Sequence, residues 1–284
     1  MHEFHVRIGP AAFRIGSVWR APIDRMAALY AGYPRPEYVD FTVRLEAASR
    51  LRRWLRPAVA IKGDYMLPDA APLPLSQGLL ATEMAMNLQV ALGWRRHLLL
   101  HASAVERDGR VLVMTGASGS GKSTLAALLS CRGWRFLGDE FVLLDPLSGD
   151  IMPFPRLISL KNSAIAAMEA ARPDALFGPL MRDTPKGDIR HMVPPADAIA
   201  RMGEGGRPAL LLFPRFGEPR AVRSVAAGET FMRLTQASTN YVALGEAGFT
   251  ALTRFVKSVP SLAIDYESGE EAIVLVEQLW GDRP

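Results

Sequence analysis

The stretch that decides the fold is "GASGSGKST", residues 116–124, near the middle of the chain. It meets the pattern G-x-x-x-x-G-K-[ST] through Gly116, Gly121, Lys122 and Ser123. The apolar run "RVLVMTG" comes before it, and a helix-forming run comes after it. A phosphate-binding loop requires this strand before it and this helix behind it. The stretch therefore predicts a nucleotide-binding α/β domain.

The residue types in this loop suit a phosphate ligand. Glycines let backbone N–H groups turn inward around phosphate oxygens, and the helix N-terminus adds a partial positive charge. Lys122 is expected to reach the β- and γ-phosphates, and the Ser123 hydroxyl to ligate Mg²⁺. ATP and Mg²⁺ are the expected cofactors. The predicted nucleotide-binding residues are Gly116, Ser118, Gly119, Ser120, Gly121, Lys122, Ser123, Thr124, Lys161 and Lys186.

The composition is that of a soluble globular protein, with 284 residues, 49% hydrophobic and 22% charged. Its single cysteine, Cys131, excludes an internal disulfide and fits a reducing cytoplasm, the expected location. The N-terminal residues do not have the pattern of a signal peptide. The most apolar stretch, 79–94, includes Glu83, Asn87 and Gln89, so it predicts a buried helix rather than a membrane span.

The charge pattern favours a small acidic ligand over nucleic acid. The net charge of +4 is scattered, without a run of five or six like charges, so no nucleic-acid partner is expected. Arginine is the usual cation here, and the only lysines are Lys62, Lys122, Lys161, Lys186 and Lys257. A lysine in a glycine or turn setting indicates that a compact point charge is needed.

A proline-rich connector, 67–78, places the predicted domain boundary after residue 75. Residues 1–75 are expected to form an α+β accessory region, and one hypothesis is that it docks the substrate. Its predicted elements are two strands around the turn at Gly9-Pro10, a helix over 22–32, and strand, helix and strand over 38–65. Ser76 is expected to cap a helix that runs to about His97.

Residues 76–284 are predicted to be the phosphate-binding domain, built on a mixed sheet. Asp108-Gly109 predicts a tight turn between two apolar strands that lead into the loop. Further strands are expected within 135–145, 208–216 and 261–267, and helices over 122–130, 163–171, 228–237, 247–258 and 269–280.

Two acidic sites are candidates to work with the loop. Asp145 follows four apolar residues, like the acid at the end of a Walker B strand, but Pro146 behind it favours a simple turn. Asp139 and Glu140 are adjacent and follow Gly138. Neighbours on a strand point to opposite faces, so both reach one site only if the chain bends there. One acid would then bind the metal, and the other would accept a proton.

The run 101–146, "HASAVERDGRVLVMTGASGSGKSTLAALLSCRGWRFLGDEFVLLDP", resembles the catalytic core of HPr kinase/phosphorylase, a bacterial serine kinase. His101 lies 15 residues before Gly116, and Asp139 lies 17 residues after Lys122; both spacings match that family. Most of the chain is more loosely similar to the HprK-related kinase A group, which includes lasso-peptide-type kinases. The shared marks are "RGWRFLGDE", "ISLKN", "DTPKG" and "TNYVALGEAGF".

The resemblance implies a phosphoenolpyruvate-carboxykinase-like P-loop fold. It also implies that Asp139 is the catalytic base for a serine hydroxyl and that His101 sits against Asp139 and orients it. Ser123 and Glu140, together with Asp139, would form the magnesium site. From the residues themselves, Arg156 and Lys161 are further candidates to neutralise charge in the transition state. The predicted catalytic set is Asp139, His101, Lys122 and Arg156.

The chain departs from the HPr kinase pattern in two places within the core. Glu140 stands where those kinases usually have Asp, and Thr124 where they usually have Glu. Their signature stretch is absent, with only "FPRLISLKN" in roughly its place. The nucleotide chemistry therefore transfers to this chain better than the protein substrate or the reverse phosphorylase reaction.

The predicted function is an ATP-dependent kinase that transfers the γ-phosphate to a serine-type hydroxyl of a small protein or peptide, such as a precursor peptide. One alternative is a kinase for a small-molecule hydroxyl. A second is a nucleotide-dependent ATPase switch that transfers no phosphate to a partner. Assembly into a homo-oligomer is left open, as is the choice between ATP and GTP.

Overall fold

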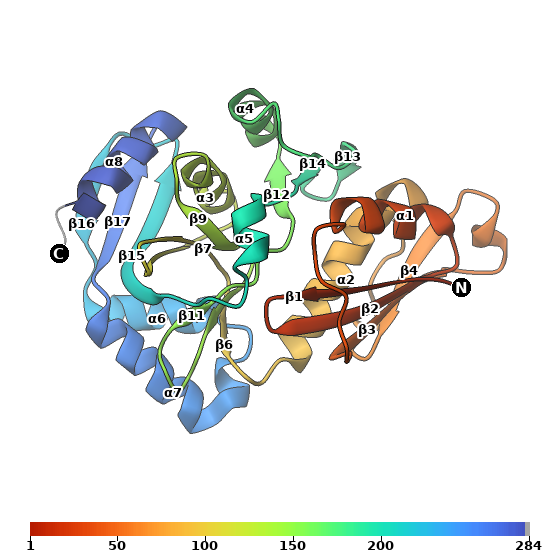
Figure 1. Cartoon of the computed structure of the whole chain (residues 1–284), viewed down its shortest axis with the longest axis horizontal. Helices are drawn as coiled ribbons and strands as arrows, with labels where there is room; N and C mark the ends of the chain where they lie inside the picture. Colours follow the sequence, from red (N-terminus) through yellow and green to blue (C-terminus); the bar gives the residue numbers. More distant parts are fainter. Residues whose placement is uncertain (282–284) are drawn as a thin grey trace.

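The computed structural model describes residues 1–281, which fold into two units that lie side by side in Figure 1. The N-terminal unit is a five-stranded sheet in the order β1-β2-β3-β4-β5. Neighbouring strands are antiparallel except for β2 and β3. The strands are β1 (His2–Ile8), β2 (Ala11–Ser17), β3 (Phe41–Ala47), β4 (Ala58–Gly63) and β5 (Leu73–Pro74).

Two helices, α1 (Arg20–Leu29) and α2 (Gly78–Gly93), pack on this sheet and close its core. The buried side of α2 lies against β3 and β4. The boundary expected after residue 75 therefore lies between the sheet and a helix that packs on it. The expected cap is also different, because Gln77 precedes α2 and no side chain caps it. A short 3-10 helix, η2 (Leu75–Gln77), occupies the predicted cap position.

The second unit is built on a six-stranded mixed sheet in the order β16-β17-β15-β8-β7-β9. The three central strands, β17, β15 and β8, run parallel. β16 and β7 run antiparallel to their neighbours β17 and β8, and the edge strand β9 is antiparallel to β7, so it has the direction of the central strands. The strands are β7 (Ala102–Arg107), β8 (Arg110–Thr115), β9 (Arg135–Gly138), β15 (Arg207–Phe216), β16 (Ala221–Ser224) and β17 (Ser261–Tyr266).

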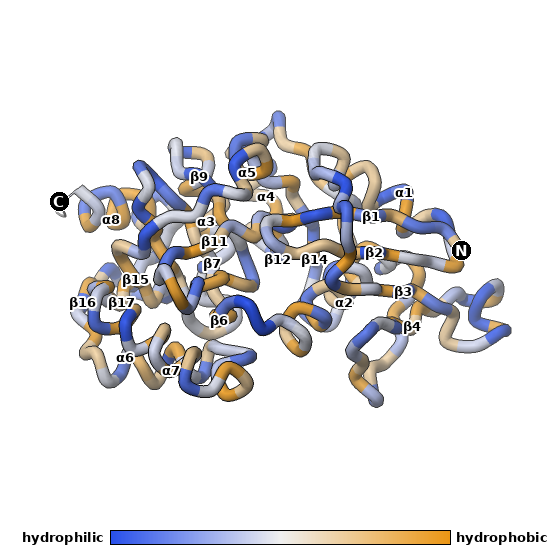
Figure 2. Tube along the Cα trace, turned by 60° about the horizontal axis from the view of Figure 1, so that its bottom comes forward, coloured by the Kyte–Doolittle hydropathy of each residue, from blue (hydrophilic) through white to orange (hydrophobic). Residues whose placement is uncertain are grey.

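Helices cover both faces of this sheet (Figure 1), and Figure 2 gives the same arrangement in a view turned by 60°. One core joins the sheet to α3 (Lys122–Ser130), α4 (Ser163–Ala171) and α8 (Gly269–Gly281). A separate core joins the other face to α6 (Ala227–Ala237) and α7 (Tyr241–Ser258). The predicted mixed α/β class is confirmed. Among residues 1–281 no helix is both long and apolar enough to cross a membrane.

Two small sheets join the units. One has the order β11-β10-β6, and the other β12-β14-β13. Their strands are β6 (Leu98–Leu100), β10 (Val142–Leu144), β11 (Ile151–Met152), β12 (Ile158–Lys161), β13 (Met181–Thr184) and β14 (Gly187–Met192), and a short helix, α5 (Ala196–Ala200), follows β14. The predicted strand that leads into the turn at Asp108-Gly109 is divided between two sheets, because His101 separates β6 from β7. The predicted strand region 135–145 holds two strands, β9 and β10, which residues 139–141 separate and which belong to different sheets.

Candidate phosphate-binding site

The glycine-rich loop runs from the end of β8 into α3, as the sequence predicts. Gly121, the residue before the helix, has φ 95°, a left-handed conformation that favours glycine. A Cβ at this position would lie 2.4 Å from the Tyr266 hydroxyl oxygen. The loop therefore takes this path only because residue 121 has no side chain, and the path aims the first N–H groups of α3 at the cavity in front of it.

Lys122 is held in the loop that precedes it. Its Nζ donates to the carbonyl oxygens of Gly116 and Ala117, each at 2.9 Å. Burial lowers the pKa of Lys122 below its usual value. Two of its three ammonium protons are used by the loop, so the third is left for a ligand.

Asp139 lies directly behind β9 and is buried beside the loop. Its Oδ1 accepts hydrogen bonds from Ser103 Oγ at 2.5 Å and from Ser123 Oγ at 3.0 Å. Its Oδ2 is buried and has no hydrogen-bond partner in the described part of the chain. Burial, and then the charge of neighbouring Glu140, raises the pKa of Asp139. This oxygen, Oδ2, can therefore accept a proton or bind a cation.

Glu140 faces the same cavity because the chain bends at this residue. Its φ of 69° is left-handed, which interrupts the alternation of a strand. One carboxylate oxygen lies 3.8 Å from Lys161 Nζ and the other 3.6 Å from His101 Nδ1. Burial acts to raise the pKa of Glu140, but Lys161, His101 and Lys186 outweigh it and hold that pKa below its usual value. The two adjacent carboxyl groups are therefore shifted in opposite directions, the pattern of an acid–base site.

His101 lies beside Glu140, not against Asp139 as expected. Its Nδ1 is 3.1 Å from the backbone oxygen of Glu140, and its side chain is 43% exposed. The position against Asp139 belongs to Ser103, two residues further along the extended chain. Ser103 is not among the predicted site residues, although its place in "HAS", two residues after His101 at the start of β7, gave a signal. Residues two apart on a strand share a face, so a His at 101 directed to the site also directs residue 103 there.

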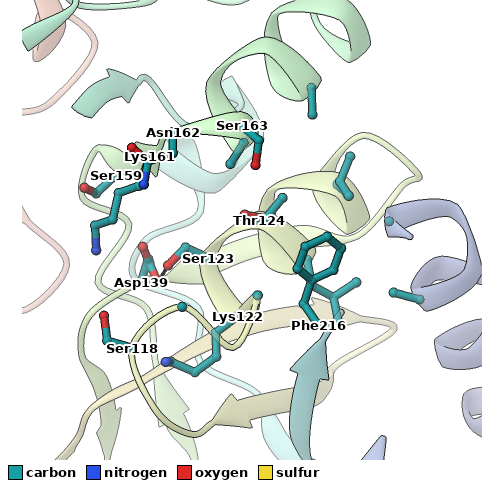
Figure 3. A pocket seen from close by; sticks show the side chains of 18 of the residues that line it. Ser118, Lys122, Ser123, Thr124, Asp139, Ser159, Lys161, Asn162, Ser163 and Phe216 are labelled. Carbon is teal, nitrogen blue, oxygen red and sulfur yellow. Dashed lines mark hydrogen bonds between the residues drawn. The ribbon is translucent and has the colours of Figure 1, made fainter. Parts of the chain in front are cut away.

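A cavity of about 680 Å³ opens in front of the loop. Figure 3 shows Lys161, Asp139 and Ser123 around one part of it and Phe216 in another part. Its polar wall includes His101, Ser118, Lys122, Ser123, Thr124, Asp139, Glu140, Ser159, Lys161 and Lys186. Its apolar wall includes Leu125, Leu128, Ala164, Ala167, Phe216, Tyr266 and Ala272. The cavity thus offers one end for a highly charged group and one for a flat apolar group.

The remaining predicted residues divide between the cavity and other places. Gly119 and Gly121 border the cavity, whereas Gly116 and Ser120 belong to the loop behind it. Asp145 closes a turn, since its carboxylate accepts from the backbone N–H groups of Leu147 and Ser148. The simpler interpretation of Asp145 is confirmed.

Arg156 lies outside the cavity wall, contrary to its expected role at the transferred phosphate. Its guanidinium is buried and pairs with the Glu83 carboxylate, and it also donates to the backbone oxygen of Glu83 at 2.9 Å and to Asn87 Oδ1. These partners belong to α2 of the N-terminal unit. Arg156 therefore joins the two units and supports β12, which begins two residues later.

The donor set for a metal consists of three adjacent groups. Within residues 1–281 there is no cluster of three or more His, Cys, Asp or Glu side chains that would hold an ion alone. The Ser123 hydroxyl and the carboxyl groups of Asp139 and Glu140 are hard oxygen donors that line the cavity beside the glycine-rich loop. This set fits Mg²⁺, which in proteins takes one or two carboxylates and completes its shell with water and substrate phosphates.

Comparisons with known proteins give a limited result. No protein-family model matches the chain, and no relative was found among curated proteins. Among solved structures, the chain is similar to the Hpr(Ser) kinase/phosphatase from Coxiella burnetii. That match has 14% sequence identity and a TM-score of 0.30, and it covers 65% of this chain and 94% of the other.

Proposed function

We propose that this chain is an ATP-dependent kinase that transfers the γ-phosphate of Mg-ATP to a serine-type hydroxyl of a small protein or peptide. The observation that carries the proposal is the carboxyl group of Asp139. It is buried, its Oδ1 is fixed by Ser103 and Ser123, and its Oδ2 has no partner beside a phosphate-binding loop. A group held in this way is prepared to accept a proton at one defined atom.

The shape of the cavity supports a nucleotide as the donor. The triphosphate fits the polar end, where the N-terminus of α3 and Lys122 supply positive charge. The adenosine fits the apolar end, where Phe216 offers a flat aromatic face and Leu128 an aliphatic contact. The serine-type acceptor is proposed from the resemblance of residues 101–146 to HPr kinases.

The chain's own residues then have distinct roles. Lys122 and the loop N–H groups bind the β- and γ-phosphates, while Lys161 and Lys186 bring positive charge to the same end of the cavity. Asp139 accepts the acceptor's proton at Oδ2 as the new bond to the γ-phosphorus forms and the bond to the bridging oxygen of ADP breaks. Ser123, Glu140 and Asp139 would hold Mg²⁺, which would neutralise charge on the phosphates.

The test is to incubate the full-length chain with γ-labelled ATP and Mg²⁺. Acceptors are offered in separate reactions: a lysate fraction of small proteins and peptides, synthetic Ser-containing peptides, and free serine. Label on a peptide or protein serine is expected. Label on free serine alone indicates a small-molecule kinase, and label released only as inorganic phosphate indicates an ATPase switch. Either of those two results would overturn the proposed acceptor.

Asp139→Asn tests the base directly. Turnover is expected to fall about 10²–10⁴-fold, while nucleotide affinity stays within a few-fold. Lys257→Ala is the matched control for a charge change, because Lys257 is an exposed residue in the last turn of α7. Full activity in Asp139→Asn would remove Asp139 from the chemistry.

A further inference from the structure

The connection between β3 and β4 is a fully exposed loop. Each of residues 48–56 is exposed, and Leu51–Arg53 form a single 3-10 turn, η1, within the loop. Figure 1 places this orange segment at the edge of the N-terminal unit, at the opposite end of the molecule from α8. The loop therefore projects away from the phosphate-binding cavity, which lies in the other unit.

Large apolar side chains crowd this loop. Leu51 is 67% exposed, Trp54 79% and Leu55 61%. Such exposed fractions are usual for charged side chains but not for large apolar ones. The loop is nevertheless held in shape: the Trp19 indole donates to the Arg53 carbonyl oxygen, and the Arg52 backbone N–H donates to Ser49 Oγ. An ordered loop that presents Trp and Leu to water indicates an interaction surface.

Arginines alternate with these apolar residues. Arg50, Arg52, Arg53 and Arg56 lie on the same loop, and the sequence has no acidic residue between Glu46 and Asp64. Within residues 1–281, none of the four arginines forms an ion pair with a carboxylate. The Arg53 guanidinium lies 5.2 Å from the Trp54 ring centroid, which keeps charge and apolar surface together. The surface of residues 48–56 is therefore positively charged and is complementary to a negatively charged partner.

We infer that residues 48–56 dock the protein onto an anionic lipid surface. Trp54, Leu51 and Leu55 enter the boundary between headgroups and acyl chains, and the arginines bind lipid phosphates. The exposed Trp54, Leu51 and Leu55 beside the arginines favour a membrane over an acidic peptide, because an aromatic and two aliphatic side chains suit the boundary between headgroups and acyl chains. This inference is independent of the proposed kinase activity.

The first test is co-sedimentation of the full-length chain with vesicles. One set contains only phosphatidylcholine, and the other adds about a third phosphatidylglycerol. Binding is expected to the anionic set and to weaken with salt, because the arginines contribute through screened charge. Arg52→Gln with Arg53→Gln is expected to reduce partitioning about thirtyfold, from the usual contribution of a basic residue near an anionic surface. Trp54→Ser with Leu55→Ser is expected to reduce it at least about tenfold.

Two controls keep the result specific. Arg220→Gln with Arg223→Gln removes the same charge from exposed residues at the β16 end of the other unit, and it is expected to leave partitioning within about threefold. Vesicles with brominated acyl chains are expected to quench tryptophan fluorescence of the native chain, with most of the quenching lost in Trp54→Phe. Thermal melting verifies that each variant is folded.

Three outcomes would overturn the inference. The chain does not sediment with anionic vesicles, or both loop variants bind like the native chain, or the control variant loses as much binding as they do. If the loop variants instead leave vesicle binding unchanged and raise the KM of a peptide acceptor, the loop is a peptide-docking surface.

Discussion

Ser103 donates a hydrogen bond of 2.5 Å to Oδ1 of Asp139 from a neighbouring strand, and both residues are buried. The contact follows from strand register: Ala104 on β7 pairs with Gly138 on β9, so the residues beside this pair meet at the end of the sheet. The hydroxyl occupies one carboxylate oxygen and leaves Oδ2 directed elsewhere. Ser103 is thereby a positioning residue for the proposed base.

Ser103→Ala tests this positioning. The hydrogen bond from Ser103 lowers the pKa of Asp139 against the larger effect of burial, so its loss raises that pKa further. We expect kcat to fall about tenfold to 10²-fold, the acid limb of its pH profile to move to higher pH, and the KM of ATP to stay within a few-fold. The measurement is kcat across pH with labelled ATP.

Two further variants define the effect at Ser103. Ser103→Thr keeps the hydroxyl and is expected to recover part of the rate. Ser130→Ala removes a serine hydroxyl that donates to the Ala127 carbonyl oxygen of its own helix, and it is expected to leave kcat and its pH profile unchanged. If kcat of Ser103→Ala is lower by the same factor at every pH, with no shift of the profile along the pH axis, the hydroxyl does not act through Asp139.

Asp139→Asn is expected to stabilise the protein at neutral pH. The pKa of Asp139 is raised in the folded state above its ordinary value of 3.8. The unfolded state therefore loses its proton more readily, and folding stability falls as pH rises from that value through the folded pKa. The amide removes this penalty, so we expect a higher Tm at pH 7, with about 2–4 °C for each kcal/mol recovered. The gain should disappear below pH 3.8.

Asp145→Asn is the matched control, for which the expected change in Tm at neutral pH has the opposite sign. The N–H groups of Ser148 and Leu147 outweigh burial and hold the pKa of Asp145 below its usual value. Its ionised form therefore supports folding above that value, and the amide should lower the Tm at neutral pH. Both variants are measured by thermal melting between pH 3 and 8. An equal Tm for Asp139→Asn and the native chain across this range would contradict a raised pKa.

The sequence predicts the parts of the site that depend on local pattern. The predicted helices over 122–130 and 163–171 coincide with α3 and α4. The chain also bends at Glu140, as it must if the adjacent Asp139 and Glu140 are to face one cavity. These features depend on apolar periodicity, glycine and turn residues within a few positions of each other.

The contacts that the sequence missed join distant segments. The pairing of Arg156 with Glu83 spans 73 residues and depends on where α2 packs. A cation near a candidate phosphate site is easily assigned to the phosphate, because its charge is visible in the sequence and its burial is not. The contact of His101 with Glu140 rather than Asp139 likewise depends on the left-handed turn at Glu140.

The lysines of the cavity are expected to separate binding from turnover. Lys122→Ala removes the cation of the loop, so we expect weaker ATP binding and a rate loss of about 10²–10³-fold. Lys161→Ala removes a cation that lies 3.8 Å from Glu140, so a smaller rate loss and a near-native Kd for ATP are expected. Calorimetric titration with ATP and labelled-phosphate kinetics measure the two quantities. Native rates in Lys122→Ala would exclude the loop from catalysis.

Glu83→Gln is expected to destabilise the junction of the two units. Glu83 and Arg156 are both buried, and Tyr30 donates to the same carboxylate at 2.8 Å. Removing one charge leaves the Arg156 guanidinium buried without its partner, which typically costs about 3–5 kcal/mol. Chemical denaturation measures the loss. The double variant Glu83→Met with Arg156→Met removes both charges, so it should be clearly more stable than Glu83→Gln. A double variant as unstable as the single one would show that the hydrogen bonds of this network, rather than its charge balance, hold β12 against the N-terminal unit.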